Sequence, residues 1–278
     1  MDIGEIGYLG VRDLAALYRA RKLSPVEVAR AVLDRIERVD PQVNAMMRVT
    51  PEHAMAAARK SETVFMQRDT PRLLEGIPVT IKDLQHTRGV QTDFGTAILQ
   101  GTIPDVDAPC VSRLLDAGGM MMGKTTSAGE WGWKGVSHAM ISGITHNPWG
   151  RGLNAGASSS GAGVAAACGY GPLHQGGDGA GSIRMPAHFS GVYGLKPTHG
   201  RVPNWPMSNN DLATHIGAMT RSVEDAALMT QAMAGPHPWD FTSLEAPPQD
   251  YASQLKAASM KGKRIAFIPT MGNLHQGH

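Results

Sequence analysis

Three segments of the chain carry side chains that could act on an acyl group. Lys82 ends the apolar run GIPVTIK, a poor place for a charge because burying an unpaired charge is costly. GASSSGAG places Ser158, Ser159 and Ser160 side by side, and GGDGAGSIRMPA places Ser182 among four glycines, where backbone N–H groups can approach a ligand closely. A serine becomes a nucleophile when a nearby base takes its proton. The sequence does not obviously supply the histidine that usually does so.

Each segment also has a purely structural interpretation. Lys82 could emerge into solvent where its strand stops, and the serine loop could be a turn or a helix cap. A tract rich in glycine and serine is normally a flexible linker. The run GVAAACGYG beside the serines is too apolar for a linker, so it predicts a buried helix flanked by tight loops.

The elements that must position these residues begin with helices. Residues 11–40 predict two of them, and Ser24, Pro25 and Glu27 supply the second with an N-cap, a first-turn proline and a capping-box partner. Apolar residues recur at helical spacing on that second helix, which indicates one packed face (Val26, Ala29, Leu33, Ile36). A third helix is expected after Pro51.

From Leu74 onward, short apolar runs alternate with helical segments. The runs IPVTI (77–81), MMMG (120–123) and RIAFIP (264–269) indicate buried strands, and CVSRLLDAG and VEDAALMTQAMA indicate helices. This alternation predicts an α/β fold with a central mixed, largely parallel sheet flanked by helices. No internal repeat or domain boundary is evident, so we expect one domain over residues 1–278, with an N-terminal helical segment over residues 1–70.

Composition excludes several classes of protein. Of the 278 residues 42% are hydrophobic and 18% charged, which is typical of globular proteins. The net charge of +2, with Lys and Arg scattered, predicts neither a nucleic-acid nor a membrane partner. Cys110 and Cys168 form no CxxC pair, and the acidic N-terminus is unlike a signal peptide. These features predict a reduced, cytoplasmic protein.

Other motifs match in letters but lack the context that their chemistry needs. Residues 118–125, GGMMMGKT, fit the P-loop pattern, yet Met120–Met122 look like a strand that follows a helix, which favours a helix–turn–strand junction. Gly161, Gly163 and Ala166 fit GxGxxA without a preceding strand. The eleven histidines show no HExxH pair, and there is no GxSxG. We therefore expect neither a metal nor a cofactor.

Taken together, the three segments resemble the amidase signature family. That family carries a lysine after an apolar strand, then a GGSSGG loop, then DTGGSIR. The counterparts here are Lys82, GASSSG (156–161) and DGAGSIR (178–184), and the spacing from Ser158 to Ser182 also fits. The flanking segments GKTTSAGEW, HNPWG, GVYGLKPTHGRVP and GAMTRSVEDAALM are similar too, so the resemblance runs from about residue 10 to residue 268.

The resemblance implies roles for particular residues. Ser182 would be the nucleophile, Ser158, in a cis peptide, would relay its proton, and Lys82 would be the general base. Such a lysine must be neutral, and burial can lower a lysine pKa from its usual 10.4 by several units. The resemblance further implies an oxyanion hole of backbone N–H groups (Gly179, Ala180, Gly181, Ser182) and three supporting residues (Ser159, Asp178, Arg184).

The chain departs from the family pattern at two levels. Ala157, Ser160 and Ala180 stand where the family usually has glycine, and a positive φ at any of them would be unfavourable. Family members normally continue well past this point, so the domain is expected to be incomplete at its C-terminus. The last residues, GKRIAFIPTMGNLHQGH, also resemble the opening of pantothenate synthetases, whose HxGH helps bind ATP; a strand and loop of the amidase fold is the preferred interpretation.

The sequence thus predicts an amidohydrolase that cleaves small-molecule amides through an acyl-serine, with esters and carbamates as further candidates. One alternative is a glutamine-dependent amidotransferase of the A type, which would need partner subunits. Another is a nucleotide-binding enzyme that uses GGMMMGKT or the terminal HQGH, and a third is an inactive remnant. Trp131, Trp133 and Met207 could line an apolar pocket or pack in the core. A homodimer is also an open possibility.

Overall fold

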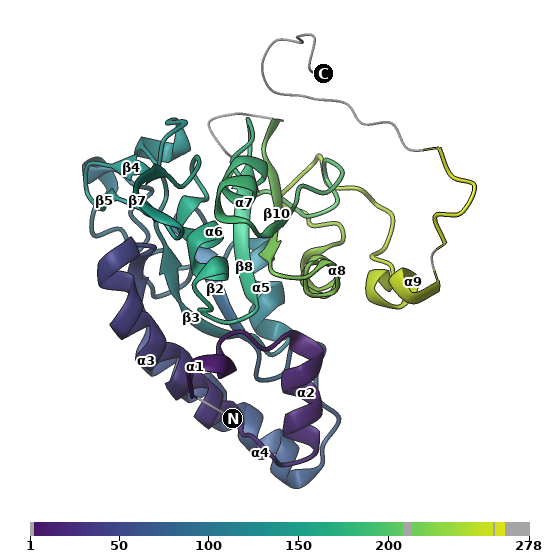
Figure 1. Ribbon diagram of the computed structural model, residues 1–278. Coiled ribbons are helices and arrows are strands. Elements are labelled where there is room, and N and C mark those ends of the chain that lie inside the picture. The colour runs from purple at the N-terminus through teal and green to yellow at the C-terminus, as the bar shows by residue number, and fades with distance from the viewer. Residues whose placement is uncertain (1–2, 208–212, 258, 265–278) are drawn as a thin grey trace.

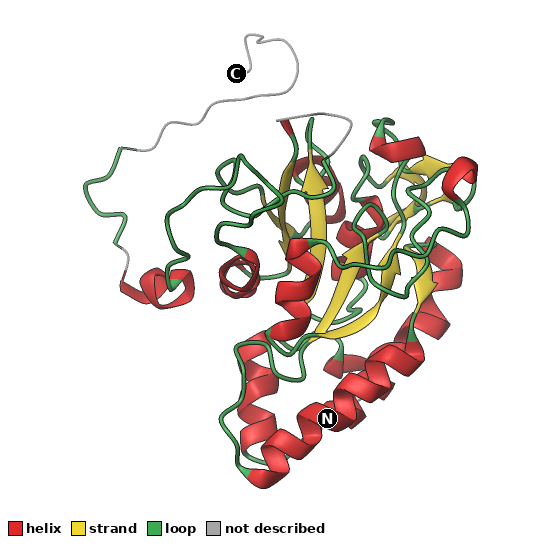
Figure 2. Ribbon diagram, turned by 180° about the vertical axis from the view of Figure 1, so that it is seen from behind, coloured by secondary structure: helices red, strands yellow, loops and turns green. Residues whose placement is uncertain are grey.

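The computed structural model describes residues 3–207, 213–257 and 259–264, and its centre is a sheet with helices on both faces (Figures 1 and 2). The sheet has six strands in the order β1-β3-β2-β8-β10-β9. Their bounds are Met46–Val49 (β1), Pro78–Lys82 (β2), Met120–Thr125 (β3), Leu173–Asp178 (β8), Tyr193–Leu195 (β9) and His215–Thr220 (β10).

The strand directions make the sheet mixed and largely parallel. β2 pairs in parallel with β3 on one side and with β8 on the other. β1 is antiparallel to β3, β10 is antiparallel to β8, and β9 is antiparallel to β10. β3, β2, β8 and β9 therefore run in one direction and β1 and β10 in the other, which confirms the predicted fold class.

The connections around β2 determine where a ligand site is expected. The chain leaves β2, forms α5 (Pro109–Asp116) and returns beside it as β3; it later forms α6 (Ser160–Ala167) and enters β8 on the opposite side of β2. α6 packs with α7 (Arg184–Ser190) on one face, and α5 packs with α8 (Val223–Met233) on the other (Figure 1). Open α/β sheets bind ligands at such a switch point, outside the carboxyl ends of the strands.

The N-terminal helices are α1 (Ile3–Ile6), α2 (Val11–Arg19), α3 (Pro25–Val43) and α4 (Pro51–Gln67). Three of them, α2 to α4, begin where the sequence predicts, and the short α1 was not predicted. In the capping box of α3, the Glu27 N–H donates to Ser24 Oγ at 3.2 Å and the Ser24 N–H donates to Glu27 Oε2 at 2.7 Å. Ala29 and Ile36 are fully buried, and Val26 and Leu33 pack against the core, as the helical spacing predicted.

Some elements carried no usable sequence signal. β1 and the polar, glycine-rich strand β8 were not predicted. Nor were the small pairings of β4 (His138–Ala139) with β5 (Gly143–Ile144) and of β6 (His146–Asn147) with β7 (Gly150–Asn154). Two 3-10 helices, η1 (Ala97–Leu99) and η2 (Glu130–Gly132), and α9 (Tyr251–Ala257) complete the described elements.

Apart from its first residue, Arg264, the predicted strand RIAFIP lies outside the described residues, and so does the terminal HQGH. In the described part of the chain, no helix is long and apolar enough to cross a membrane.

α6 lies unusually close to its neighbours because its side chains are small. A Cβ on Gly161 would lie 2.5 Å from the Ala45 carbonyl oxygen and 2.6 Å from the Thr126 nitrogen, closer than real Cβ atoms come to backbone. The first turn of α6 therefore packs directly on the backbone beside β3. Because the serine loop runs into that turn, this packing sets the position of the loop.

We expect Gly161→Ala to destabilise the fold by about 1–3 kcal/mol, the usual range for overpacking, because the new methyl meets backbone that cannot rotate away. The measurement is the midpoint of urea-induced unfolding. Gly135→Ala is the matched control, since a Cβ there meets nothing within 4 Å. Equal midpoints for the two variants would contradict this account of α6.

Candidate active site

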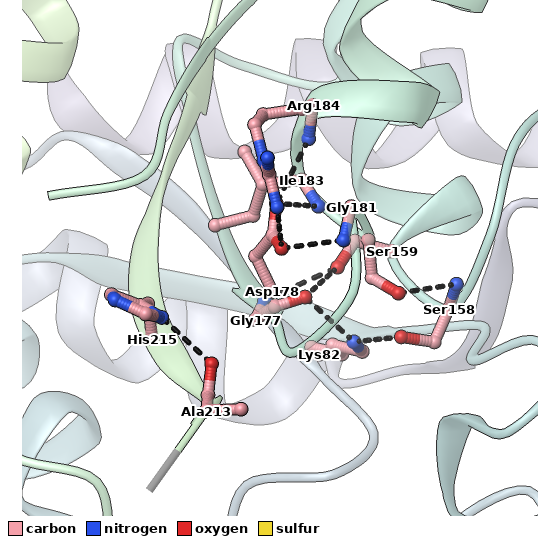
Figure 3. Close-up of polar contacts among 11 residues, drawn as sticks. Lys82, Ser158, Ser159, Gly177, Asp178, Gly181, Ile183, Arg184, Ala213 and His215 are labelled. Carbon is pink, nitrogen blue, oxygen red and sulfur yellow. Dashed lines mark hydrogen bonds and ion pairs between the residues drawn. The ribbon is translucent and has the colours of Figure 1, made fainter. Parts of the chain in front are cut away.

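The residues singled out in the sequence meet at the carboxyl edge of the sheet (Figure 3). Lys82 is the last residue of β2, Ser158 lies in the loop before α6, and Ser182 lies in the loop between β8 and α7. Lys82 Nζ donates to Ser158 Oγ at 2.7 Å and to the Gly177 carbonyl oxygen at 3.3 Å. The Ser158 N–H donates to Ser182 Oγ at 3.3 Å. All three residues are buried, so the cluster is largely shielded from water.

Burial changes the acid–base behaviour of Lys82. The side chain is 2% exposed, and its two hydrogen-bond acceptors are a hydroxyl and a carbonyl, neither of them charged. Burial lowers the pKa of Lys82 to about 7, and the attraction of the Asp178 carboxylate opposes this only in part. A lysine with such a pKa is substantially neutral near pH 7 and can accept a proton.

The geometry of the serine loop differs from the prediction in one respect. The peptide bond before Ser158 is trans, not cis, and Trp205–Pro206 is the one cis peptide within the described ranges. The loop turns instead at Gly156, whose φ is 106° and where a Cβ would lie 2.6 Å from the Pro186 Cα. With this trans geometry the Ser158 hydroxyl bonds to Lys82 and its N–H bonds to Ser182. A proton relay would therefore require the Ser158 side chain to rotate toward Ser182.

The glycine loop before Ser182 offers backbone donors, though fewer than predicted. The Gly181 N–H donates to Asp178 Oδ1 at 2.7 Å, which removes it as a ready donor to a ligand. The N–H groups of Gly179, Ala180 and Ser182 have no acceptor among the described residues. Three donors are therefore available to an oxyanion, because Asp178 uses the fourth to hold the loop.

Asp178 organises this loop from beneath. Besides Gly181, it accepts the Ile183 N–H at 3.1 Å and forms an ion pair with Arg184 at 2.9 Å (Figure 3). Burial alone would raise the pKa of Asp178, but the Arg184 guanidinium and the backbone donors outweigh it and lower that pKa to about 2. The carboxylate thus stays ionised.

Ser159 ties the serine loop to β8. Its Oγ donates to the Gly177 carbonyl at 3.0 Å and accepts the Gly177 N–H at 3.1 Å. Because the same carbonyl also accepts from Lys82, Ser159 helps to fix one of the two acceptors of the lysine. Ser159, Asp178 and Arg184 thus contact the loops around Ser182 rather than the space where a substrate would react.

The three departures from glycine introduce no backbone strain. Ala157, Ser160 and Ala180 all avoid the left-handed region, which in the described chain holds just five residues other than glycine (Arg21, Asn44, Arg68, Phe94, Trp131). In the loop before Ser182 the positive φ, 108°, falls at Gly181, where glycine is retained.

A cavity of about 260 Å³ opens beside the cluster. Lys82, Ser158, Gly177, Gly179 and Ser182 form its base. Its walls are mostly apolar, with several uncharged polar groups (Leu84, Gln85, His86, Phe94, Leu99, Thr102, Trp131, Gly132, Asn204, Pro206, Met207, Thr214, Ile216). Trp131 and Met207 thus line the pocket, one of the two predicted options, whereas Trp133 is absent from the described lining and is 66% exposed.

Sequence reasoning missed the segment that forms one wall. Leu84, Gln85 and His86 come soon after Lys82 in the chain, so their position after a strand-end lysine was the available signal; Phe94 lies further along and had no such signal. What fixes their conformation is Lys124. Its buried Nζ donates to the Gln85 carbonyl at 2.5 Å and to the hydroxyls of Thr87 and Thr92 at 2.9 and 3.1 Å.

GGMMMGKT therefore folds as a helix–turn–strand junction, as predicted. Met120–Thr125 is the buried strand β3, and all three donors of the Lys124 ammonium are already used within the protein. Gly161, Gly163 and Ala166 lie inside α6, with no loop for a pyrophosphate. Within the described ranges, no group of three or more His, Cys, Asp or Glu residues is arranged to hold a metal ion.

Comparison with known proteins agrees with this geometry. Residues 27–277 match the protein family described as Amidase. An acylamidase of Rhodococcus erythropolis is 39% identical over 272 residues, covering 96% of this chain and 56% of that protein. The A-type subunit of a glutamyl-tRNA(Gln) amidotransferase from Geobacter metallireducens is 38% identical over 264 residues, covering 95% of this chain and 54% of that protein.

A solved structure is also similar. The crystal structure of a bacterial aryl acylamidase belonging to the amidase signature enzymes superposes with a TM-score of 0.82 and 30% identity, covering 89% of this chain and 52% of that one. The chain thus spans about half the length of the relatives it matches.

The pKa of Lys82 predicts how the reactivity of Ser182 depends on pH. Because the base form of the lysine is needed, the rate of modification by a fluorophosphonate should rise about tenfold per pH unit below 7 and level off above it, with half of the maximum near pH 7. The rate is measured by mass spectrometry between pH 5 and 9. A flat profile, or one unchanged in Lys82→Ala, would show that Lys82 is not the base.

Lys124 should matter for stability. Burial lowers the pKa of Lys124 to about 8 against the opposing attraction of Asp83. Two positive charges, Lys124 and Arg48, act on the buried Asp83 carboxylate, and removing the ammonium would take away the one with the larger effect. We expect Lys124→Met to cost about 3 kcal/mol of unfolding free energy. Lys60→Met, on the exposed side of α4, is the control and should change the unfolding free energy little.

ATP should raise the melting temperature of neither the wild type nor Lys124→Met. A magnesium-dependent increase in the wild type that is lost in Lys124→Met would restore the nucleotide-binding alternative.

Proposed function

The chain belongs to the amidase signature family, and on this premise we propose that it is an amidohydrolase that cleaves the C–N bond of small-molecule amides through an acyl-Ser182 intermediate. The observation that carries the proposal is the buried Lys82–Ser158–Ser182 cluster at the base of the cavity. Family members act on small-molecule amides. Because this chain spans about half the length of its relatives, we also propose that the chain is itself active.

In the acylation step, neutral Lys82 takes the proton of the Ser158 hydroxyl while Ser158, rotated toward Ser182, takes the proton of the nucleophile. Ser182 Oγ then bonds to the substrate carbonyl carbon, and the carbonyl π electrons move onto oxygen. The 2.7 Å contact between Lys82 and Ser158 and the lowered pKa of Lys82 support the first transfer. General base catalysis of this kind typically contributes about 10²–10⁴ in rate.

The negative oxygen of the tetrahedral intermediate needs donors that are in place beforehand. The N–H groups of Gly179, Ala180 and Ser182 are the available ones. Asp178 holds their loop through Gly181, Ile183 and Arg184, so little reorganisation is required when charge develops. Loss of one oxyanion donor typically raises the barrier by about 2.7–4 kcal/mol.

Collapse of the intermediate breaks the C–N bond. The leaving amine takes the proton stored on Lys82, passed back through Ser158, and departs as a neutral amine. Water then attacks the acyl-Ser182 ester, giving its proton to Lys82 by the same path, and the acid is released with Ser182 reprotonated. An ester with the same acyl group would give the same acyl-serine with an alcohol as leaving group, and a carbamate would give a carbamoyl-serine with loss of the alcohol, so both are further candidate substrates.

The cavity favours a hydrolase of uncharged amides over a glutamine-dependent amidotransferase. Free glutamine carries an ammonium and a carboxylate, and burying either without a counter-charge is costly. Among the described lining residues, the ionisable groups are Lys82 and His86, and burial, helped by nearby Lys124, lowers the pKa of His86. Among the described residues, the walls therefore offer no permanently charged side chain to either end of glutamine.

A cytoplasmic location and a homodimeric state stay predictions. The two cysteines, Cys110 and Cys168, are buried free thiols, which is consistent with a reducing compartment. The proposed chemistry uses side chains and backbone groups of the chain alone, so the mechanism as written calls for no cofactor.

The experiment is to treat the folded chain with a fluorophosphonate and to map the adduct by mass spectrometry. A single adduct on Ser182, formed at least about 100-fold more slowly in Lys82→Ala and Ser158→Ala, is expected. Neutral aryl and alkyl amides should be hydrolysed and L-glutamine should not. A folded protein without an adduct would refute the proposal, and ammonia release from glutamine alone would favour the amidotransferase.

A further inference from the structure

Aromatic side chains are scarce in this protein but gather at the cavity. The sequence holds five Trp, five Tyr and five Phe residues. The rings of Trp131 and Phe94 lie 5.2 Å apart, Phe94 lies 5.5 Å from His86, and His86 lies 5.4 Å from Trp205. Trp205 in turn lies 4.6 Å from Trp239. Three of these rings, Trp131, Phe94 and His86, line the cavity, so one side of the pocket is an aromatic wall.

Two of these residues have a backbone conformation that bulky side chains seldom adopt. Phe94 has a φ of 55° and Trp131 a φ of 58°. The other residues with positive φ, apart from glycines, terminate helices: Asn44 and Arg68 cap α3 and α4, and Arg21 follows the C-cap of α2. Helix ends account for those three. Phe94 and Trp131 instead lie in tight turns, which are closed by the Thr96 N–H donating to the Asp93 carbonyl at 3.0 Å and by the Trp133 N–H donating to the Glu130 carbonyl at 3.2 Å; each is followed by a glycine of positive φ. Bulky aromatic residues are uncommon at such positions, and residues in sparsely populated conformations concentrate at functional sites.

The strained pair is tied to the reacting groups. The Trp131 N–H donates to the Phe94 carbonyl at 2.9 Å, and the Phe94 N–H donates at 3.2 Å to the carbonyl of Asp83, which follows Lys82 in the chain. On the other side, a Cβ on Gly132 would lie 3.0 Å from Ser158 Cβ and 3.1 Å from Ser158 Oγ. The backbone of Gly132 therefore packs against Ser158, and Trp131 is the residue that precedes Gly132 in the chain.

Exposure distinguishes the two rings. Phe94 is 7% exposed, whereas Trp131 is 43% exposed although it lines the cavity. Phe94 thus backs the wall, and a large part of the indole remains accessible to a ligand. Aromatic rings attract other planar rings in offset or edge-to-face contact, beyond what the buried area alone contributes.

We propose that Trp131, backed by Phe94, is an aryl-binding subsite, and that the preferred substrates among uncharged amides bear a planar aromatic group next to the scissile bond. This rests on the proposed function of the Ser182 site. The described walls carry no permanently charged side chain, which favours uncharged groups, and the planar ring favours a planar group over a bulky one. Trp131 is accordingly a specificity-determining residue.

The test compares two reagents of similar size that modify the same serine: phenylmethanesulfonyl fluoride, with a planar ring, and cyclohexylmethanesulfonyl fluoride, with a puckered one. The readout is the second-order rate of Ser182 modification, so turnover is not required. Trp131→Asn removes the ring while keeping a residue that tolerates a positive φ, and Trp131→Phe keeps a ring. Trp133→Asn is the matched control, because Trp133 lies two positions away and is mostly exposed.

In the wild-type protein we expect the phenyl reagent to react faster. Trp131→Asn should slow the phenyl reagent about tenfold while changing the cyclohexyl rate less than about threefold, since a tenfold loss matches one good ring contact. Trp131→Phe and Trp133→Asn should keep the preference. The melting temperature of Trp131→Asn should equal or exceed that of the wild type, because backbone strain is relieved.

Three results would overturn the subsite. The phenyl preference could be absent from the wild type, it could survive in Trp131→Asn, or both rates could fall together with the melting temperature, as a structural role predicts. Each leaves a Ser182 adduct in the wild type, so the proposed function would stand. A folded wild-type protein that forms no adduct with either reagent would refute the proposed function and the subsite together.

Discussion

The burial of one lysine without a bonded counter-ion is the constraint on which the site depends. Lys82 ends the central strand β2, between β3 and β8, and its ammonium contacts a serine hydroxyl and a backbone carbonyl. The nearby carboxylate, Asp178, bonds to Arg184 and three backbone donors instead, and its attraction raises the pKa of Lys82 by less than burial lowers it. The close approach of α6 at Gly161 and the contacts of Ser159 with β8 hold the serine loop against the sheet, so the Lys82 side chain stays buried.

A second buried lysine shows what a different environment does to the same side chain. Lys124 lies on β3 in register with Ile81, the neighbour of Lys82, so the two lysines point to opposite faces of the sheet. Three acceptors use all of its donors, and the buried carboxylate of Asp83 lies close enough for its pKa to depend on Lys124. Lys124 thereby holds the segment that supplies the aromatic wall, whereas Lys82 is left able to exchange a proton.

The aromatic wall and the loop before Ser182 are held by different contacts. Asp178 anchors Gly181 to Arg184, while Phe94 and Trp131 are linked through backbone hydrogen bonds to each other and to Asp83. The wall reaches the reacting groups on another side, where Gly132 packs against Ser158. The positive φ angles of Phe94 and Trp131 indicate that their present orientation is maintained against a local backbone preference.

What the sequence alone determined was local: the capping box at Ser24, the strand that ends at Lys82, the strand that begins at Met120, and the motif positions of Lys82, Ser158 and Ser182, each readable from a few neighbouring residues. Strand β8 was not predicted from the sequence because LHQGGD has no apolar run. Its burial comes from β2, β10 and α6. Only the tertiary structure decided that the Ser158 peptide is trans, that Asp178 occupies the Gly181 donor, and that Lys124 supports a wall instead of a phosphate. These properties arise from contacts between residues tens of positions apart, whose burial and distance no local pattern encodes.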